Sequence, residues 1–167
     1  MKKYFILFCL FAIAFKIHSQ DSFPEQLKKI LADSDNNFST FKGSVSELRK
    51  VDTTFVSKIT LDGTSKNTIV TGHWQKQEQN GKETNAYYAL IDSLEFKKGM
   101  AIVKKWKRKL PNVLGKSYHQ KEISLDDERF GSLKGVSFSS ESITVAVYRS
   151  ALPKSEYCHI YLCISVK

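Results

Sequence analysis

One serine and lysine pair in this chain has the spacing of an acyl-transfer nucleophile and its base. Ser39 and Lys42 form the pattern S-x-x-K, which serves that chemistry when further elements such as K-[ST]-G accompany it. The sequence contains no K-[ST]-G, and the pair falls near the expected end of a helix, where the helix dipole does not activate a nucleophile. We interpret the spacing as a coincidence.

Two acidic clusters have the residue types of a cation site. Residues 33–37 (D-x-D-x-N) have the opening pattern of a calcium loop, which also needs a glycine at its turn and a glutamate at its twelfth position. Phe38 and Ser44 occupy those two places. The second cluster, residues 126–128, has the composition of a solvated loop. Neither cluster therefore predicts a metal site.

Histidines and cysteines, the other residues suited to metal or nucleophilic chemistry, are widely spaced. His159 and Cys163 share one face of an expected strand, but at ~3.3 Å per residue they lie ~13 Å apart, too far for one zinc ion. Cys158 and Cys163 lie ~16 Å apart on opposite faces, beyond the reach of a disulfide. A contact across strands between His73 and Cys163 has no support in the sequence. We predict no catalytic residues, no metal and no cofactor.

The most distinctive stretch of the sequence is Ser93–Leu110, which has the pattern of a helix with an apolar and a basic face. Its apolar residues recur at helical spacing, which predicts a face packed on a sheet. They are Phe96, Met100, Val103 and Leu110. The rest of the stretch carries seven basic residues against a single acid. The basic residues are Lys97, Lys98, Lys104, Lys105, Lys107, Arg108 and Lys109.

Two interpretations of this basic face are open. In the first, Trp106 lies among the cations and the surface contacts anionic lipid head groups or another polyanion. In the second, the lysines only solvate the helix and Trp106 packs at the edge of the sheet. Nucleic acid fits the charge, but the expected export of the protein argues against it.

The outer face of the sheet is a second candidate surface. Tyr157 and Tyr161 lie opposite the apolar residues of the last strand, and Tyr148 joins them with either Tyr87 or Tyr88, depending on strand parity. Tyrosine-rich faces favour protein contacts. The candidate binding residues are therefore Lys97, Lys98, Lys104, Lys105, Trp106, Lys107, Arg108, Lys109, Tyr157 and Tyr161.

The first nineteen residues predict a signal peptide. Lys2 and Lys3 precede a twelve-residue apolar run, 4–15, which is shorter than the ~20 residues that span a bilayer. We expect cleavage after Ser19, with an uncleaved anchor as the alternative. The protein would then be periplasmic or extracellular, with residues 20–167 forming a single domain of 148 residues.

The positive charge of the chain is local. Removing residues 1–19 takes away three lysines and lowers the formal net charge from +9 to +6. Residues 93–110 alone carry +6, so the rest of the domain is balanced. Local positive charge predicts a surface that meets polyanions.

The residue pattern in the first half of the domain predicts one helix followed by strands. Ser22 and Glu25 form a capping-box pattern, and helical spacing of apolar residues extends from about Phe23 to about Phe41, where Gly43 offers a left-handed end. Alternation with a period of two then predicts strands within 53–61, 68–77 and 84–91. Asn80-Gly81 predicts the turn between the last two of these strands.

Residues 84–91 also suit the beginning of a helix that continues into the basic stretch. Their apolar residues would then face away from those of the basic stretch, so one continuous helix would need burial on two sides. We therefore predict a strand there and a new helix that begins at Asp92-Ser93 and stops at Pro111.

Residues 112–128 predict a loop, and the last forty residues predict strands at 130–138, 142–150 and 157–166. The fold class is α+β with the order α-β-β-β-α-β-β-β. We expect two helices packed on one face of a mostly antiparallel sheet, as a two-layer sandwich.

These observations predict an exported, non-enzymatic binding domain that contacts an anionic envelope surface or a protein partner through the basic helix. One alternative is a small secreted enzyme whose polar residues, such as His73, His159 and 126–128, converge only in the folded chain. The other is a structural or assembly factor of the envelope.

Overall fold

The computed structural model describes residues 21–50, 52–72, 84–127 and 131–167. Two longer helices and eight strands make up most of this part of the chain. The helical elements are α2 (Phe23–Ala32), η1 (Asp33–Asn36), η2 (Ser39–Phe41), α3 (Phe96–Lys109) and α4 (Pro111–Leu114). The strands are β1 (Lys42–Leu48), β2 (Asp52–Ser57), β3 (Lys66–Gly72), β4 (Thr84–Glu95), β5 (His119–Asp127), β6 (Gly131–Ser139), β7 (Ile143–Ala151) and β8 (Tyr157–Val166).

All eight strands form one antiparallel sheet in the order β1-β2-β3-β4-β8-β7-β6-β5. Each half of the chain contributes a helix followed by a meander of four strands, and β4 and β8 pair in the middle. The α+β class and the antiparallel sheet are thus as predicted. The predicted order is wrong in its number of strands, because each half holds four and not three.

The two strands that the sequence analysis missed, β1 and β5, are the edges of the sheet. Every residue of β1 is at least partly exposed, and Ile123 is the best-covered apolar side chain of β5. A strand without a buried face shows little apolar alternation, so periodicity does not detect it. Residues 119–127, predicted as loop, are therefore strand.

The first helix ends at Ala32 and not near Phe41. Its capping box is present, with the Ser22 backbone N–H donating to Glu25 Oε2 at 2.9 Å. Two short 3₁₀ turns follow, separated by Asn37 and Phe38 in left-handed conformation at φ 53° and 56°. These two residues turn the chain towards β1, so Gly43 lies in a strand and not at the helix end.

The basic helix is separate from the preceding strand, as predicted, but its boundary differs. β4 continues to Glu95 across an irregularity between Leu90 and Asp92, and α3 begins at Phe96. Val103 and Leu110 are buried and Met100 is partly buried, so the predicted apolar face is confirmed. The pairing of β4 with β8 down to Tyr157 holds residues 92–95 extended.

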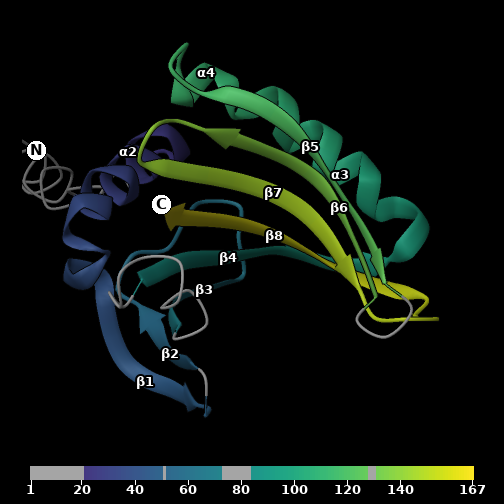
Figure 1. Cartoon of the computed structure of the whole chain (residues 1–167), viewed down its shortest axis with the longest axis horizontal. Helices are drawn as coiled ribbons and strands as arrows, with labels where there is room; N and C mark the ends of the chain where they lie inside the picture. The colour runs from purple at the N-terminus through teal and green to yellow at the C-terminus, as the bar shows by residue number, and fades with distance from the viewer. Residues whose placement is uncertain (1–20, 51, 73–83, 128–130) are drawn as a thin grey trace, which may run out of the picture.

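The helices do not both lie on one face of the sheet, which corrects the expected sandwich. α3 packs along β4, β6, β7 and β8, whereas α2 packs against α4 and η1. In Figure 1, α3 runs along the outer side of the curved sheet and α2 lies near one end of the strands. The rings of Phe23 and Trp106 meet edge to face, with centroids 5.0 Å apart, and join α2 to the end of α3.

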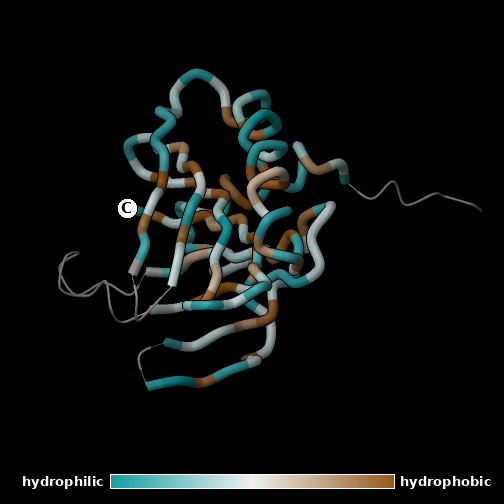
Figure 2. The backbone as a smooth tube through the Cα atoms, turned by 90° about the vertical axis from the view of Figure 1, so that its right-hand side faces the viewer, coloured by the Kyte–Doolittle hydropathy of each residue, from teal (hydrophilic) through white to brown (hydrophobic). Residues whose placement is uncertain are grey.

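One hydrophobic cluster connects the helices with the strands. Residues of β8 alternate as predicted, with Cys158, Ile160, Leu162 and Ile164 buried. Figure 2 shows this alternation of hydrophobic and hydrophilic residues along the strands. Within the described residues, no helix is long and apolar enough to cross a membrane.

Candidate binding groove on the concave face of the sheet

The face of the sheet turned away from α3 is concave and contains two adjoining cavities. The larger, of about 420 Å³, is lined by residues of five elements and the adjacent turn. The smaller, of about 210 Å³, continues across β4 to β5 and β6. Val70, Tyr88 and Tyr148 line both cavities, so they form one continuous groove, hereafter the concave groove. Its other lining residues are Arg49, Asp52, Thr54, Lys66, Thr68, Gly72, Ala86, Leu90, Ile123, Leu133, Ala146, His159, Tyr161, Cys163 and Ser165.

Strong curvature of the sheet creates this groove. Val70 of β3 and Ile123 of β5 line the same small cavity although four strands separate β3 from β5 in the sheet order. Neighbouring strands lie ~4.8 Å apart, so a flat sheet would hold these residues ~24 Å apart. The sheet must therefore curl around the space that they share.

Small residues on the inner face allow the curl. Gly135 of β6 lies directly opposite Tyr148 of β7, and a Cβ on Gly135 would come within 2.6 Å of both Cα and Cβ of Tyr148. Side chains on a concave face converge, so glycine in the middle of a strand marks a place where backbone and neighbour approach closely. Ala86 of β4 and Ala146 of β7 are further small residues that line the groove.

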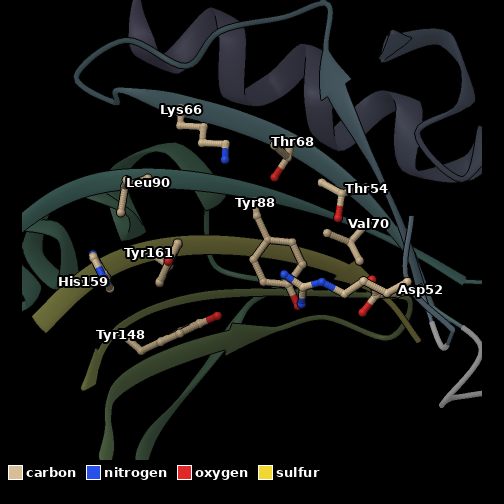
Figure 3. Close-up of a pocket in the computed structure, with 11 residues that line it drawn as sticks. Asp52, Thr54, Lys66, Thr68, Val70, Tyr88, Leu90, Tyr148, His159 and Tyr161 are labelled. Carbon is tan, nitrogen blue, oxygen red and sulfur yellow. The ribbon is translucent and has the colours of Figure 1, made fainter. Parts of the chain in front are cut away.

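Three tyrosines from three strands form the floor of the concave groove. Tyr88 comes from β4, Tyr148 from β7 and Tyr161 from β8, and the rings of Tyr148 and Tyr161 have centroids 5.9 Å apart. Figure 3 shows Tyr88 and Tyr148 projecting into the same space from different strands. Each ring is partly buried. Together they present apolar faces with phenolic hydroxyls that can donate or accept hydrogen bonds.

The groups on the floor are neutral at physiological pH. Burial raises the pKa of Tyr88 and of Tyr148 well above the ordinary value, and the nearby Cys163 thiol raises both further. Burial also raises the pKa of Cys163 to about 12. Cys163 therefore remains a thiol and not a nucleophilic thiolate in the physiological range.

Charged side chains lie at the β2–β3 end of the groove. Arg49, Lys66 and Asp52 line the larger cavity, while no charged residue of the described part of the chain lines the smaller one. Arg49 forms a two-pronged ion pair with Glu47, with donor–acceptor distances of 2.7 and 2.9 Å. With Glu47 included, two cations and two carboxylates meet at this end, so its charges are balanced.

A serine and a histidine meet at the rim of the groove. Ser93 Oγ lies 2.7 Å from His159 Nδ1, and the two residues are directly opposite in the β4–β8 register. The neighbouring Asp92 carboxylate accepts the Ser93 backbone N–H instead of orienting the imidazole. Within the described residues, no carboxylate accepts a hydrogen bond from the second ring nitrogen of His159. A nucleophile and base without an orienting acid are an incomplete triad, so we assign the pair no catalytic role.

Comparison with known proteins gives no functional guide. Searches against protein-family models, curated proteins and solved structures found no match to this chain. The concave groove and the basic helix must therefore be interpreted from their own chemistry.

The structure separates the candidate residues of the basic helix into four groups. Trp106 is 5% exposed and packs on Phe23, so it does not reach the surface. Lys109 lies over the rings of these two residues, 3.6 Å from the Phe23 centroid. Lys98 forms an ion pair with Glu95 at 3.1 Å, and Lys107 forms one with Glu122. The remaining cations point outwards: Lys97, Lys104, Lys105 and Arg108.

The tyrosine candidates separate as well. Tyr161 lines the groove, whereas Tyr157 is 64% exposed at the end of β8 and lines neither cavity. Of the two tyrosines left open by strand parity, Tyr88 lies on the concave face. Tyr87 is fully buried on the opposite face and donates a hydrogen bond to Asn67 Oδ1 at 2.5 Å.

The other residues considered for chemistry do not come together. Asp33 is buried in a 3₁₀ turn, and Asp126 is exposed and forms an ion pair with Lys134 at 2.8 Å. His73, Asn80-Gly81, Glu128 and the expected signal peptide lie outside the described residues. Within the described ranges, no three His, Cys, Asp or Glu side chains are placed to hold a metal ion.

Sequence reasoning found Tyr148 and Tyr161 as members of one face but missed the groove itself. Lys66, Val70 and Ile123 line it from strands that the sequence does not place relative to one another. A sequence signal does exist in Gly135, which lies within the strand expected at 130–138, because glycine inside a strand is typical of a close approach between backbones.

Proposed function

We propose that this protein is a non-enzymatic binding domain whose concave groove takes an extended segment of a partner protein. The observation that carries the proposal is the continuous groove floored by Tyr88, Tyr148 and Tyr161 on the sheet face opposite α3. Tyrosine supplies large contact area with little conformational entropy to lose, and it is enriched at protein interfaces.

The shape and chemistry of the groove favour a segment of protein as the occupant. The groove crosses strands from β2 to β5, so it is longer than one small cavity. Its middle is apolar and aromatic, and one end is lined by two cations and one carboxylate, with Glu47 balancing the second cation. A segment with an apolar or aromatic side chain beside a polar residue would match both parts.

Peptide selection tests this proposal. A displayed peptide library is selected against the purified protein, and the dissociation constants of selected peptides are measured for wild type and variants. We expect Tyr148→Ala to weaken binding about 30-fold, since truncation of an anchoring tyrosine costs ~2 kcal/mol. Tyr157→Ala is the matched control, because this tyrosine lines neither cavity, and it should leave binding unchanged.

A second variant identifies the contribution of the hydroxyl group. Tyr148→Phe keeps the ring and removes the phenolic oxygen, so it should weaken binding less than Tyr148→Ala. The proposal is wrong if selection yields no peptide, or if the selected peptides bind wild type and Tyr148→Ala equally well.

Export is part of the same proposal and rests on residues 1–19. Sequencing the N-terminus of the protein recovered from its native cells should give Gln20 as the first residue. A chain that begins at Met1 and is recovered in the cytosolic fraction would refute it.

A further inference from the structure

A separate surface lies on α3, on the side of the sheet opposite the concave groove. Lys97, Lys104, Lys105 and Arg108 are all exposed, and with Ala101 they occupy positions i, i+4, i+7, i+8 and i+11 of the helix. This spacing places them in a single outward row, hereafter the cationic stripe. It is ~16 Å long at 1.5 Å per residue.

Nearby acids do not neutralise the cationic stripe. Within the described residues, the ion pairs of α3 are Lys98 with Glu95 and Lys107 with Glu122, and both lie beside the stripe. Helix α3 contains seven basic residues and no acidic residue. Because these charges are fixed on one rigid helix, their potentials add instead of averaging out over a mobile segment.

The buried position of Trp106 decides what kind of contact the stripe can make. An amphipathic helix that inserts into a membrane places aromatic and apolar residues in the lipid. Here the apolar face of α3, including Val103, Trp106 and Leu110, is used in the core of the domain. The stripe can therefore attract an anionic surface but has no exposed large apolar side chain to insert.

We propose that the cationic stripe docks the protein on an anionic lipid bilayer, with α3 lying flat on the head groups. Figure 1 shows α3 as a straight ridge on the outer side of the sheet, which suits a broad surface. Three of the four cations are lysines, whose compact charges suit the mobile phosphates of lipids. No aromatic side chain lies in the stripe to stack on the bases of a nucleic acid.

In this orientation the concave groove faces away from the membrane. A partner segment and the bilayer would then contact opposite sides of the same sheet. The proposal does not depend on the function proposed for the groove, because it involves none of the groove residues.

Vesicle sedimentation with the protein after removal of residues 1–19 tests the cationic stripe, because the apolar run 4–15 would itself insert into both kinds of vesicle. The probes are vesicles of phosphatidylcholine with 30% phosphatidylglycerol and vesicles of phosphatidylcholine alone, at low and high salt. One cation near an anionic membrane contributes about fivefold to the partition coefficient, or ~1 kcal/mol. Replacing all four cations of the stripe with glutamine should therefore reduce binding to the anionic vesicles by at least a hundredfold.

A control with the same net charge separates the stripe from overall basicity. It replaces four exposed lysines elsewhere with glutamine, namely Lys28, Lys50, Lys58 and Lys121. We expect this control to lose less than tenfold, and wild-type binding to fall steeply with salt because exposed charges are screened within ~10 Å at 0.1 M. Circular dichroism melting establishes that both variants are folded.

Several results would overturn the proposal. These are equal binding to the two kinds of vesicle, or equal losses in the two quadruple variants. Tighter binding to a single-stranded oligonucleotide than to the anionic vesicles, lost in the stripe variant, would show that the stripe serves nucleic acid instead.

Discussion

The curvature of the sheet depends on the absence of a side chain at Gly135. Alanine at this position would place a Cβ against the carbonyl oxygen of Val147 and within 2.6 Å of Cα and Cβ of Tyr148. These are backbone atoms or atoms directly attached to the backbone, so rotation of a side chain cannot relieve the contact. β6 is paired on both sides, with β5 and with β7, and cannot shift away from one neighbour without losing the other.

The expected cost of Gly135→Ala follows from this geometry. Overpacking in a constrained place costs up to ~3 kcal/mol. For a domain of 150 to 250 residues, each kcal/mol lowers the melting temperature by ~2–4 °C. We therefore expect Gly135→Ala to lower the melting temperature by ~6–12 °C and to reduce affinity for groove-binding peptides.

Gly43→Ala is the matched control for this prediction. A Cβ there would meet the Val56 carbonyl oxygen at 2.6 Å, which is also a backbone contact. Gly43 lies in the edge strand β1, which is paired only with β2 and can move outwards. Its substitution should lower the melting temperature by less than half as much.

Thermal unfolding followed by circular dichroism measures both variants. The reasoning is refuted if Gly135→Ala melts within ~2 °C of the wild type, or if the two alanine variants lose equal stability. The first outcome would mean that the sheet can flatten at little cost, so the groove would not be fixed by the fold.

Three further predictions concern buried side chains. Tyr87→Phe should lower the free energy of unfolding by ~1 kcal/mol in urea titrations, because the hydroxyl donates to the buried Asn67 Oδ1. Trp106→Ala should cost ~3–5 kcal/mol, because the indole is buried against Phe23, and the loss should appear without any membrane. Stability should fall as the pH rises from 9 to about 12, because the Cys163 thiol ionises in the unfolded chain while its raised pKa keeps it neutral in the folded one.

Each of these predictions has a control and a contrary result. Tyr157→Phe, at an exposed position, should leave stability unchanged, and an equal loss would contradict the Tyr87 argument. Lys105→Ala should change stability by less than ~0.5 kcal/mol, and a loss as large as that of Trp106→Ala would contradict the assignment of the indole to the core. Cys163→Ala should flatten the decline in stability between pH 9 and 10, and an unchanged slope would rule out this thiol as its cause.

Local patterns in the sequence were sufficient to predict the elements that have one buried face. The apolar alternation of Cys158, Ile160, Leu162 and Ile164 predicted β8, and the 3.6-residue spacing of Val103 and Leu110 predicted α3. On one continuous helix, the apolar residues of 84–91 would lie opposite those of 96–110. This predicted a break between strand and helix, and the structure has one. Burial on one side imposes a period on the sequence, and a period can be read without coordinates.

Boundaries and edge strands could not be predicted in the same way. β4 continues through residues 92–95 because β8 is there to pair with, and that partner lies more than sixty residues later in the chain. The first helix stops at Ala32 because the Asn37 backbone and side chain are held by Asn85, another distant residue. In both places a long-range hydrogen bond overrides the local preference.

By itself, the sequence determined the α+β class, the antiparallel sheet and the concentration of positive charge on one helix. Composition and local spacing can be read directly along the chain, so they do not depend on knowledge of the fold. Only the tertiary structure decided that Trp106 belongs to the core, that four of the helix cations form one outward row, and that Tyr88, Tyr148 and Tyr161 floor a common groove. The physical reason is that strand register and sheet curvature bring distant residues together, and neither leaves a periodic signal along the chain.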